Sequence, residues 1–166
     1  AAIQLFEIGQ LLWAAQGITH ARGFRTAPSA GALYPLELYV VAGHVEGLDT
    51  GMYHYDPEGH RLVNANGDDW RKRRSRAALS QFCIQDAAAV VVFAAVYERT
   101  TQKYGQRGIR YVHMEVGHAA QNLFLQVEAL GLATVVVGAF DDDEVTRLLN
   151  LPTNVHPLML MPIGRQ

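Results

Sequence analysis

Residues 25–37 read RTAPSAGALYPLE and run directly into the apolar segment LYVVA at residues 38–42. Two prolines restrict the backbone on either side of the turn, while Ala30, Gly31 and Ala32 between them carry almost no side chain. Such a loop lets a flat ligand lie directly against the backbone, and the apolar run predicts a buried strand over residues 36–42. An ordinary tight connection into a strand has the same composition, so the residues alone leave both interpretations open.

The composition is that of one folded domain over residues 1–166, because 49% of the side chains are hydrophobic and the chain is long enough to bury a core. A formal net charge of -2 argues against a general affinity for nucleic acid or for an anionic membrane surface. The longest apolar run, residues 87–97, is about half of the ~20 residues that cross a bilayer as a helix. The single cysteine, Cys83, cannot form an internal disulfide, which fits a cytoplasmic location.

Hydrophobic periodicity predicts that helices and strands are mixed along the chain. A first helix ends at Gly17, a polar helix lies near residues 70–80, and residues 97–110 form a loop or a broken helix. Apolar residues recur every three or four positions over residues 111–130, which makes this the strongest helix prediction. A short helix begins at the acidic residues 141–143.

The remaining elements are predicted strands. Residues 51–55 and 60–63 flank the turn sequence DPEG and form a β-hairpin. Buried strands are expected at 36–42, 88–96, 133–138 and 156–163. Strands, helices and a hairpin in this order indicate the α+β class with one layered sheet.

Several segments together resemble the nitroreductase superfamily. The loop at residues 25–37 is similar to the flavin-contacting loop of its SagB-type dehydrogenases, a branch that includes the oxidases converting peptide azolines to azoles. The later segments that match in order and spacing are QNLF at 121–124, LGLAT at 130–134, VGAFD at 137–141 and LLNLP at 148–152. The resemblance implies a nitroreductase-like α+β fold, a central mixed sheet flanked by helices, and a homodimer with FMN at the subunit interface.

The resemblance also implies which residues bind FMN. A redox enzyme needs a cofactor to accept a hydride, and the sequence has neither GxGxxG after a strand nor a GxxxxGK[ST] phosphate loop. The implied ring contacts lie in two turns, one from each subunit: Pro28, Ser29, Ala30 and Gly31 from one chain, Gly138 and Ala139 from the other. Arg25 and Arg165 are the cations in matching segments, and arginine suits phosphate geometry. Taken alone, either arginine would be better explained as a surface residue.

The start of the chain differs from the family pattern. Members usually carry an RRSxR-like segment before the first helix, and its arginines and serine hold the FMN phosphate. This sequence starts with Ala1, Ala2 and Ile3, already within the expected helix. The expectation is therefore that the native protein is short or that the chain is a fragment, with part of the phosphate site missing.

The sequence KYGQR at residues 103–107 resembles the segment of azoline-oxidising members in which an adjacent lysine and tyrosine are the proposed catalytic pair. The resemblance implies Lys103 and Tyr104 as catalytic residues. One would take the proton that leaves the carbon next to the hydride donor, and the other would orient or relay it. Neighbouring Arg107 and Arg110 favour the deprotonated form of either group. Without the resemblance, such a pair is usually solvated surface.

Two other patterns carry less weight. Glu115 and His118 have the spacing of a di-iron ligand pair, with His113 nearby, but the sequence offers neither a second such pair nor an HExxH motif, so no metal site is predicted. The basic tract at residues 71–76 is better explained as a solvated helix face than as a nucleic-acid patch, given the overall charge.

The sequence favours an FMN-dependent oxidoreductase that dehydrogenates a small-molecule or peptide-derived substrate. An NAD(P)H-dependent nitro or quinone reductase is the alternative enzyme. A non-catalytic, flavin-binding partner subunit is the alternative outside enzymes, because the usual N-terminal phosphate-binding segment is missing. The residues do not name the substrate.

Overall fold

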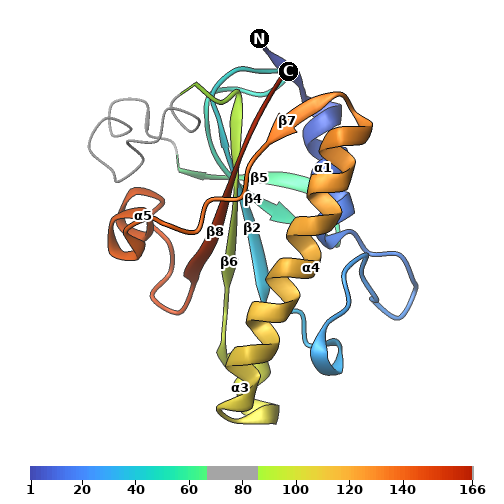
Figure 1. Ribbon diagram of the computed structural model, residues 1–166, viewed down its shortest axis with the longest axis vertical. Helices are drawn as coiled ribbons and strands as arrows, with labels where there is room; N and C mark the ends of the chain where they lie inside the picture. Colours follow the sequence, from blue (N-terminus) through green and yellow to red (C-terminus); the bar gives the residue numbers. More distant parts are fainter. Residues whose placement is uncertain (67–85, 166) are drawn as a thin grey trace.

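The computed structural model describes residues 1–66 and 86–165. Its main sheet has six strands in the spatial order β5-β4-β2-β6-β8-β7, and all of its pairings are antiparallel (Figure 1). The strands are β2 (Leu36–Ala42), β4 (Gly51–Asp56), β5 (Arg61–Asn66), β6 (Ala89–Ala95), β7 (Leu132–Thr134) and β8 (His156–Arg165). A separate parallel pair joins β1 (Ile3–Gln4) to β3 (Val45–Glu46), so both kinds of strand pairing occur in the chain.

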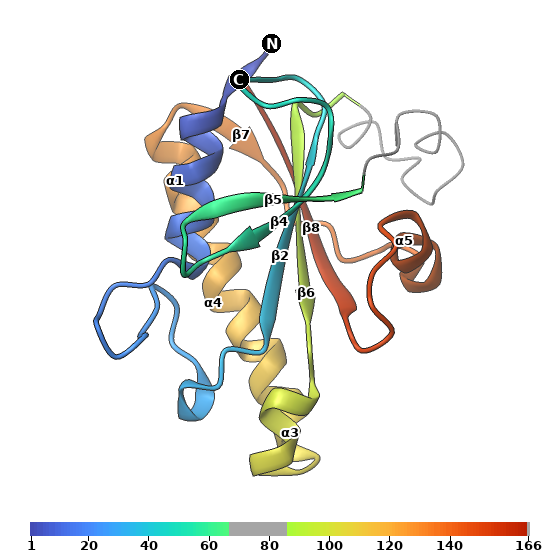
Figure 2. The same cartoon turned by 180° about the vertical axis from the view of Figure 1, so that it is seen from behind.

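The helices lie on two sides of this sheet. They are α1 (Leu5–Gln16), the short 3₁₀ turn η1 (Ala30–Ala32), α3 (Glu98–Tyr104), α4 (Arg107–Ala129) and α5 (Asp142–Leu148). Figures 1 and 2 show α1 and α4 together on one side of the sheet and α5 on the other. The α+β class predicted from the sequence is confirmed. Within the described residues, every helix is too short or too polar to span a membrane.

Strand β6 lies at the centre of the sheet, and all of its residues are buried. Its side chains alternate between two hydrophobic clusters: Val91 and Phe93 belong to the cluster with α1 and α4, while Val90 and Val92 belong to the cluster on the α5 side. Because both faces are covered, the strand is apolar throughout rather than alternating. The predicted central strand over residues 88–96 is confirmed.

The longest helix, α4, packs against α1 and the sheet through the apolar positions that the sequence pattern marks. It begins a few residues before the predicted start at residue 111. Gly105, with a φ of 57°, separates it from α3, and its N–H donates to the carbonyl of Thr101 at 2.7 Å. Glycine tolerates this backbone conformation, so the chain ends one helix and starts the next here. The broken helix expected at residues 97–110 is confirmed.

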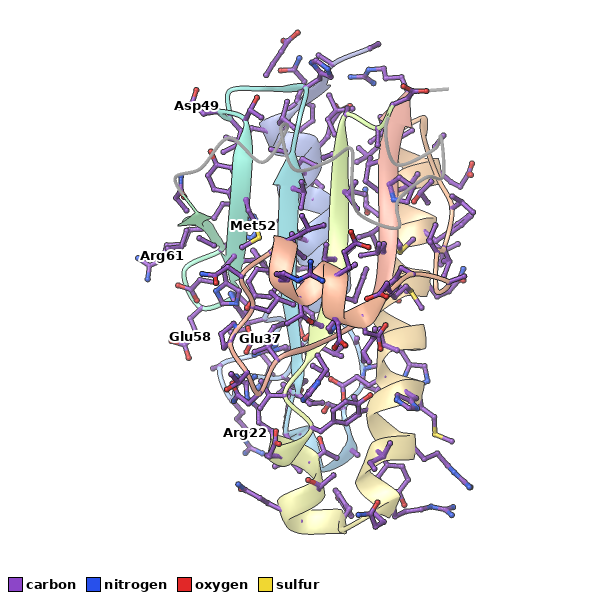
Figure 3. The ribbon with its side chains drawn as sticks, turned by 90° about the vertical axis from the view of Figure 1, so that its left-hand side faces the viewer. Arg22, Glu37, Asp49, Met52, Glu58 and Arg61 are labelled. Atoms are coloured by element: carbon purple, nitrogen blue, oxygen red, sulfur yellow. The ribbon has the colours of Figure 1, made fainter. Side chains whose placement is uncertain are left out.

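Strand β2 has the predicted bounds, and the predicted hairpin is present as β4 and β5. At its turn the Asp56 carboxylate accepts hydrogen bonds from Arg61 Nε at 2.8 Å and from the Glu58 amide at 3.0 Å. Figure 3 shows Glu58 and Arg61 at this end of the hairpin and Asp49 beyond the other end of β4.

The strand predicted over residues 133–138 is wrong in its second half. The regular pairing of β7 ends at Thr134, and the side chains of Val135 and Val136 are 46% and 44% exposed. Val137 then returns to the sheet, where its N–H donates to Leu160 at 2.9 Å. A run of valines therefore marks a surface segment here. The predicted polar helix near residues 70–80, the basic tract and Cys83 lie outside the described residues.

Candidate active site

The loop before β2 has an uncommon backbone conformation. Gly31, Ala32 and Tyr34 have positive φ angles of 64°, 54° and 47°. The turn is closed by two hydrogen bonds to Ser29: its carbonyl accepts from the Ala32 amide at 3.0 Å, and its Oγ accepts from the Tyr34 amide at 2.9 Å. Left-handed backbone costs a non-glycine residue roughly 1 kcal/mol or more. The loop therefore depends on contacts that hold it in place.

The fold brings this loop to the predicted catalytic pair. A Cβ built on Gly31 would lie 2.9 Å from the Tyr104 hydroxyl and 3.0 Å from Lys103 Nζ. The two polar ends thus lie close to the Gly31 backbone, where a larger side chain would displace them. The pair is also compact in itself, because Lys103 Nζ is 5.4 Å from the centre of the Tyr104 ring. Residues far apart in the sequence are assembled here within one chain.

A cavity of about 240 Å³ lies between the loop and α4. Its lining comes from the loop and from one face of the helix: Pro28, Ser29, Ala30, Tyr111, Met114, Glu115 and His118. The Tyr111 ring packs edge to face on the Tyr104 ring, with 5.2 Å between the ring centres. Tyr111 therefore lies between the cavity and the Lys103–Tyr104 pair. We refer to this cavity as the loop cavity.

Glu115 is a candidate that the sequence reasoning weighed only as a metal ligand, and set aside. Its side chain is buried in the loop cavity wall, with the residue only 3% exposed. Burial raises the pKa of the Glu115 carboxyl to about 7, although a hydrogen bond with Ser29 and the charge of Arg25 act in the opposite direction. The helical spacing gave a signal, because Glu115 lies three residues after Val112 and four before Ala119, both in the core.

Arg25 lies beside the loop and is partly buried. Its Nη1 donates to the Gln16 side-chain oxygen at 2.8 Å, and its guanidinium lies 4.6 Å from the centre of the Tyr34 ring. Burial lowers the pKa of this guanidinium. Its Nε is buried without a hydrogen-bond partner among the described residues. Arg25 therefore has a donor left for an acceptor group.

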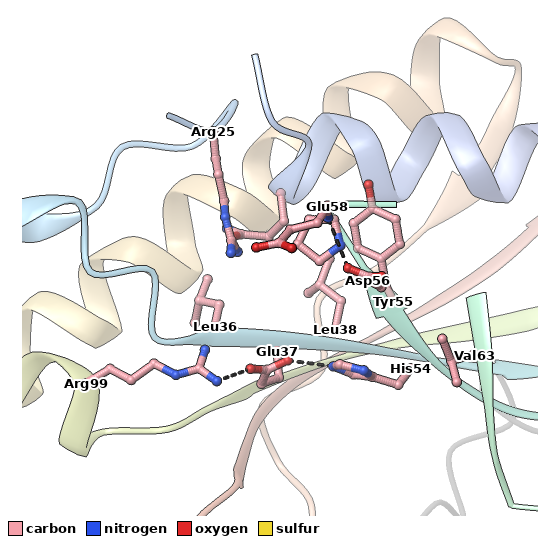
Figure 4. A pocket seen from close by; sticks show the side chains of 12 residues that line it. Arg25, Leu36, Glu37, Leu38, His54, Tyr55, Asp56, Glu58, Val63 and Arg99 are labelled. Carbon is pink, nitrogen blue, oxygen red and sulfur yellow. Dashed lines mark hydrogen bonds and ion pairs between the residues drawn. The ribbon is translucent and has the colours of Figure 1, made fainter. Parts of the chain in front are cut away.

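A second cavity, of about 400 Å³, lies on the other side of Arg25 between β2, the hairpin and α3 (Figure 4). In its wall the Glu37 carboxylate pairs with His54 at 2.5 Å and also with Arg99. Burial alone would raise the pKa of Glu37, but the hydrogen bonds from His54 and Arg99 hold it below its usual range. Arg99 donates in addition to the Tyr34 carbonyl at 3.1 Å. This network ties the helix that carries Lys103 and Tyr104 to the end of the loop.

The other predicted cofactor contacts lie elsewhere in the chain. Gly138 and Ala139 are exposed and follow Val137, which belongs to the cluster on the α5 side of the sheet. Arg165 pairs with Glu7 at 3.0 Å and donates to the Ala2 carbonyl at 3.2 Å. Glu7 lies in the first turn of α1, whereas the Gln16 partner of Arg25 is the last residue of that helix. One chain therefore does not bring the two arginines, or the two small-residue turns, together.

Comparison with known proteins identifies the family. Residues 1–165 match the model described as "Nitroreductase family". The chain belongs to the nitroreductase family. It is 49% identical over 164 residues to the protein named "Putative nitroreductase MJ1384" from Methanocaldococcus jannaschii, covering 99% of this chain and 82% of that protein. The fold expected from the sequence is confirmed, and the protein is an oxidoreductase of a family whose members generally bind flavin.

The family also includes peptide-processing relatives. The chain is 30% identical over 146 residues to the microcin B17-processing protein McbC of Escherichia coli, covering 84% of this chain but only 54% of McbC. A chain of the E. coli microcin synthetase McbBCD complex with truncated pro-MccB17 bound superposes with a TM-score of 0.84 at 27% identity. That superposition covers 99% of this chain and 65% of the other.

Proposed function

We propose that this protein is an FMN-dependent oxidoreductase of the SagB-type branch, which dehydrogenates a small-molecule or peptide-derived substrate. The observation that carries the proposal is the contact of the Gly31 backbone with the polar ends of Lys103 and Tyr104. A bare backbone turn beside two proton-transfer groups is what a flavin dehydrogenation site needs. The likeness to McbC supports the choice of branch.

The residues present fit FMN. The turn at residues 28–32 has small side chains, so a flat ring can approach its backbone, and Arg25 keeps one buried donor without a partner among the described residues. The residues that we propose hold the cofactor come from two chains: Arg25, Pro28, Ser29, Ala30 and Gly31 from one subunit, and Gly138, Ala139 and Arg165 from the other. When bound, FMN supplies the acceptor for the hydride that leaves the substrate.

The chain itself supplies the proton acceptor. As the hydride leaves one substrate carbon with its electron pair, a proton must leave the neighbouring carbon so that a double bond forms between the two atoms. Lys103 Nζ and Tyr104 Oη are the groups positioned for that proton, and we propose them as the catalytic residues. Together the two transfers remove two electrons and two protons from the substrate, and one of the protons goes to the Lys103–Tyr104 pair.

We also propose that the protein is a homodimer. Large apolar side chains are exposed on the outer faces of two helices, Phe6 at 65% and Trp13 at 43% on α1, Leu125 at 60% and Met114 at 52% on α4. A second copy would remove this surface from water and bring Gly138 and Ala139 to the partner's loop. Light scattering at micromolar concentration should give twice the mass of one chain, and a single-chain mass would contradict the proposal. A cytoplasmic location stays a prediction from the single cysteine.

An NAD(P)H-dependent nitro or quinone reductase is the second candidate. It is favoured by the 49% identity to a protein named as a nitroreductase. In that case the substrate of the reductive step is the nicotinamide, and the proton-transfer pair would serve the oxidative half of the cycle. The non-catalytic subunit that the sequence leaves open is less well supported, because the candidate catalytic pair lies directly against the loop.

The absorption spectrum of the purified protein, followed by anaerobic mixing with substrates, tests these functions. We expect FMN to bind with a dissociation constant below ~100 μM, a weak limit by the standards of cofactors. Rapid bleaching by NADPH favours the reductase, and bleaching by an azoline peptide but not by NADPH favours the dehydrogenase. A protein that rejects FMN at that concentration would contradict both.

A further inference from the structure

Arg99 is a charged residue that the proposed chemistry does not use. It lies in the first turn of α3, the seven-residue helix that ends with Lys103 and Tyr104. A helix this short has little stability of its own, so its contacts with the rest of the chain set its position. The helix packs on α4, and Arg99 adds contacts with the loop and with β2.

Arg99 spans the point where the loop becomes strand β2. Its Nη1 donates to the Tyr34 carbonyl at 3.1 Å, and its Nη2 donates to the Glu37 carboxylate. Pro35 lies between these two acceptors in the sequence, and its carbonyl accepts from the Val96 amide at 2.9 Å, just before α3. The start of α3 is therefore bonded to the end of the loop and to the start of β2.

The Glu37 side chain holds the guanidinium of Arg99 in this position. Glu37 lies on β2, its side chain is only 15% exposed, and its two oxygens have different partners. Its Oε1 accepts from Arg99, while its Oε2 lies 2.5 Å from His54 Nε2 on β4 (Figure 4). An isolated ion pair on the surface contributes little, but a partly buried network with several partners restricts where the guanidinium can lie.

The far end of α3 meets the same loop at Gly31. An added Cβ at Gly31 would lie 2.9 Å from the Tyr104 hydroxyl and 3.0 Å from Lys103 Nζ. Arg99 and Lys103 are four residues apart, which places them on one face of the helix, about one turn from each other. One helix face thus contacts the loop at two separate points, the Tyr34 carbonyl and Gly31. Two separated contacts fix the orientation of a helix that a single contact would leave free to tilt.

We infer that Arg99 is a positioning residue, which fastens α3 to the loop so that Lys103 and Tyr104 stay beside Gly31. Glu37 acts through Arg99 by holding its guanidinium. The importance of the pair for catalysis rests on the proposed function, but the fastening of α3 does not. Arg99 is not assigned a contact with substrate or cofactor.

Hydrogen exchange tests the fastening without cofactor or substrate. The Thr101 and Gly105 amides donate within the α3 segment, and the Ala32 and Tyr34 amides donate to Ser29 within the loop. Losing the fastening should speed exchange in these two segments together, although they are far apart in the sequence. A general loss of stability would instead speed exchange in the central strand β6 as well.

Arg99→Met should speed exchange of these α3 and loop amides about fivefold, a modest effect because the Arg99 side chain is 42% exposed. Arg99→Lys keeps the charge, but one ammonium group cannot span both acceptors, so it should resemble Arg99→Met. The matched control is Arg61→Met, which removes the pair with Asp56 at 2.8 Å in the hairpin and should leave both segments within about twofold of the parent. Parental exchange in Arg99→Met, or in Arg99→Lys, would overturn the inference.

A double variant tests whether Glu37 acts through Arg99. Glu37→Gln removes the negative charge that holds the guanidinium, so it should speed exchange of the loop amides, though less than Arg99→Met does. If Glu37 acts through Arg99, the two changes combined should exchange no faster than Arg99→Met alone. Additive effects would overturn the role assigned to Glu37.

Anaerobic flavin reduction by an azoline peptide gives the functional readout. Arg99→Met should lower the limiting rate about tenfold, because misplaced catalytic groups act poorly, while FMN affinity and the half-saturating peptide concentration stay within about twofold. In the Lys103→Ala background the same change should have little further effect, since the group to be positioned is gone. A full additional tenfold loss there, or a parental limiting rate in Arg99→Met despite faster exchange, would overturn the link to the pair. A parent protein without flavin reduction contradicts the proposed function, while the exchange experiment still decides the fastening.

Discussion

The two small-residue turns that resemble flavin contacts differ in what surrounds them. The turn at Gly31 is exposed but has neighbours from its own chain, since an added Cβ there would meet Tyr104 and Lys103 at about 3 Å. At Gly138, an added Cβ would meet nothing within 4 Å. The first turn lies beside its proposed catalytic partners, whereas the second has open space around Gly138. This difference fits the proposal that each chain contributes one half of a site and that the half at Gly138 serves a partner.

The largest expected effect is on the rate of flavin reduction and concerns Lys103 and Tyr104, beside the Gly31 turn. Lys103→Ala and Tyr104→Phe should keep FMN and the dimer while slowing substrate-dependent flavin reduction by about 10²-fold or more, the usual contribution of a general base. Stopped-flow absorbance with the physiological substrate measures this rate. Reduction at the parent rate in both variants would mean that the pair is only surface, and loss of FMN would give it a structural role instead.

The next effect is a pH dependence of stability that belongs to Glu115. Its pKa is about 7 in the folded protein, above the ordinary value of 4.5, so the folded state binds the proton more tightly than the unfolded state does. The parent should therefore lose stability as the pH rises from about 4.5 to about 7, and the loss should then level off. Glu115→Gln has no carboxyl to titrate at this position, so it should lack this part of the pH dependence.

Urea denaturation at several pH values compares the two proteins. Below pH ~4 the carboxyl is protonated in both states, so this term makes no difference. Above pH ~7 the Gln variant should be relatively more stable, by on the order of 2 kcal/mol once solvent screening is allowed for. Parallel stability curves for parent and variant would show that the folded protein does not shift the titration of Glu115.

Most of the fold was predictable because each element carries its own local pattern. The bounds of β2, the hairpin turn and the glycine between α3 and α4 follow from apolar periodicity and turn residues alone. The exposed valines at 135 and 136 were not predictable in this way. Local propensity describes a strand-forming segment, whereas tertiary packing decides whether anything covers it.

The sequence segments that form the candidate site were predictable, but the contacts between them in space were not. The loop and the Lys103–Tyr104 pair each have a recognisable sequence, but nothing in either indicates that the ends of both side chains lie close to Gly31. The pairing of Arg165 with Glu7 depends on where β8 ends relative to α1, which is likewise a tertiary property. For the same reason the sequence did not show Glu115 as a buried acid in the wall of the loop cavity.

Alanine substitutions at Gly31 and Gly117 compare a strained turn with an unstrained helix position. Gly31→Ala should destabilise the protein by on the order of 1 kcal/mol because of its φ of 64°, even if the flexible ends of Lys103 and Tyr104 move aside. Gly117→Ala is the control: the position is within α4 with nothing within 4 Å of an added Cβ, and alanine should stabilise it by about 0.5–1 kcal/mol. Thermal denaturation reports both changes, and equal effects at the two positions would contradict the strain at Gly31.

The last prediction tests whether the second turn acts on a partner. Gly138→Val should leave the stability of one chain unchanged, since an added side chain has open space, but it should block FMN if the partner's loop faces that surface. Lys103→Ala should bind FMN and lack activity. In a mixed dimer of these two variants, one site carries both defects and the other carries neither. Random reassortment makes about half of the dimers mixed, so about a quarter of the parental activity should return when the two inactive proteins are mixed. No recovery, despite mass spectrometry showing mixed dimers, would mean that Gly138 and Lys103 serve the same site from one chain. Parental activity of Gly138→Val alone would mean that Gly138 serves no site.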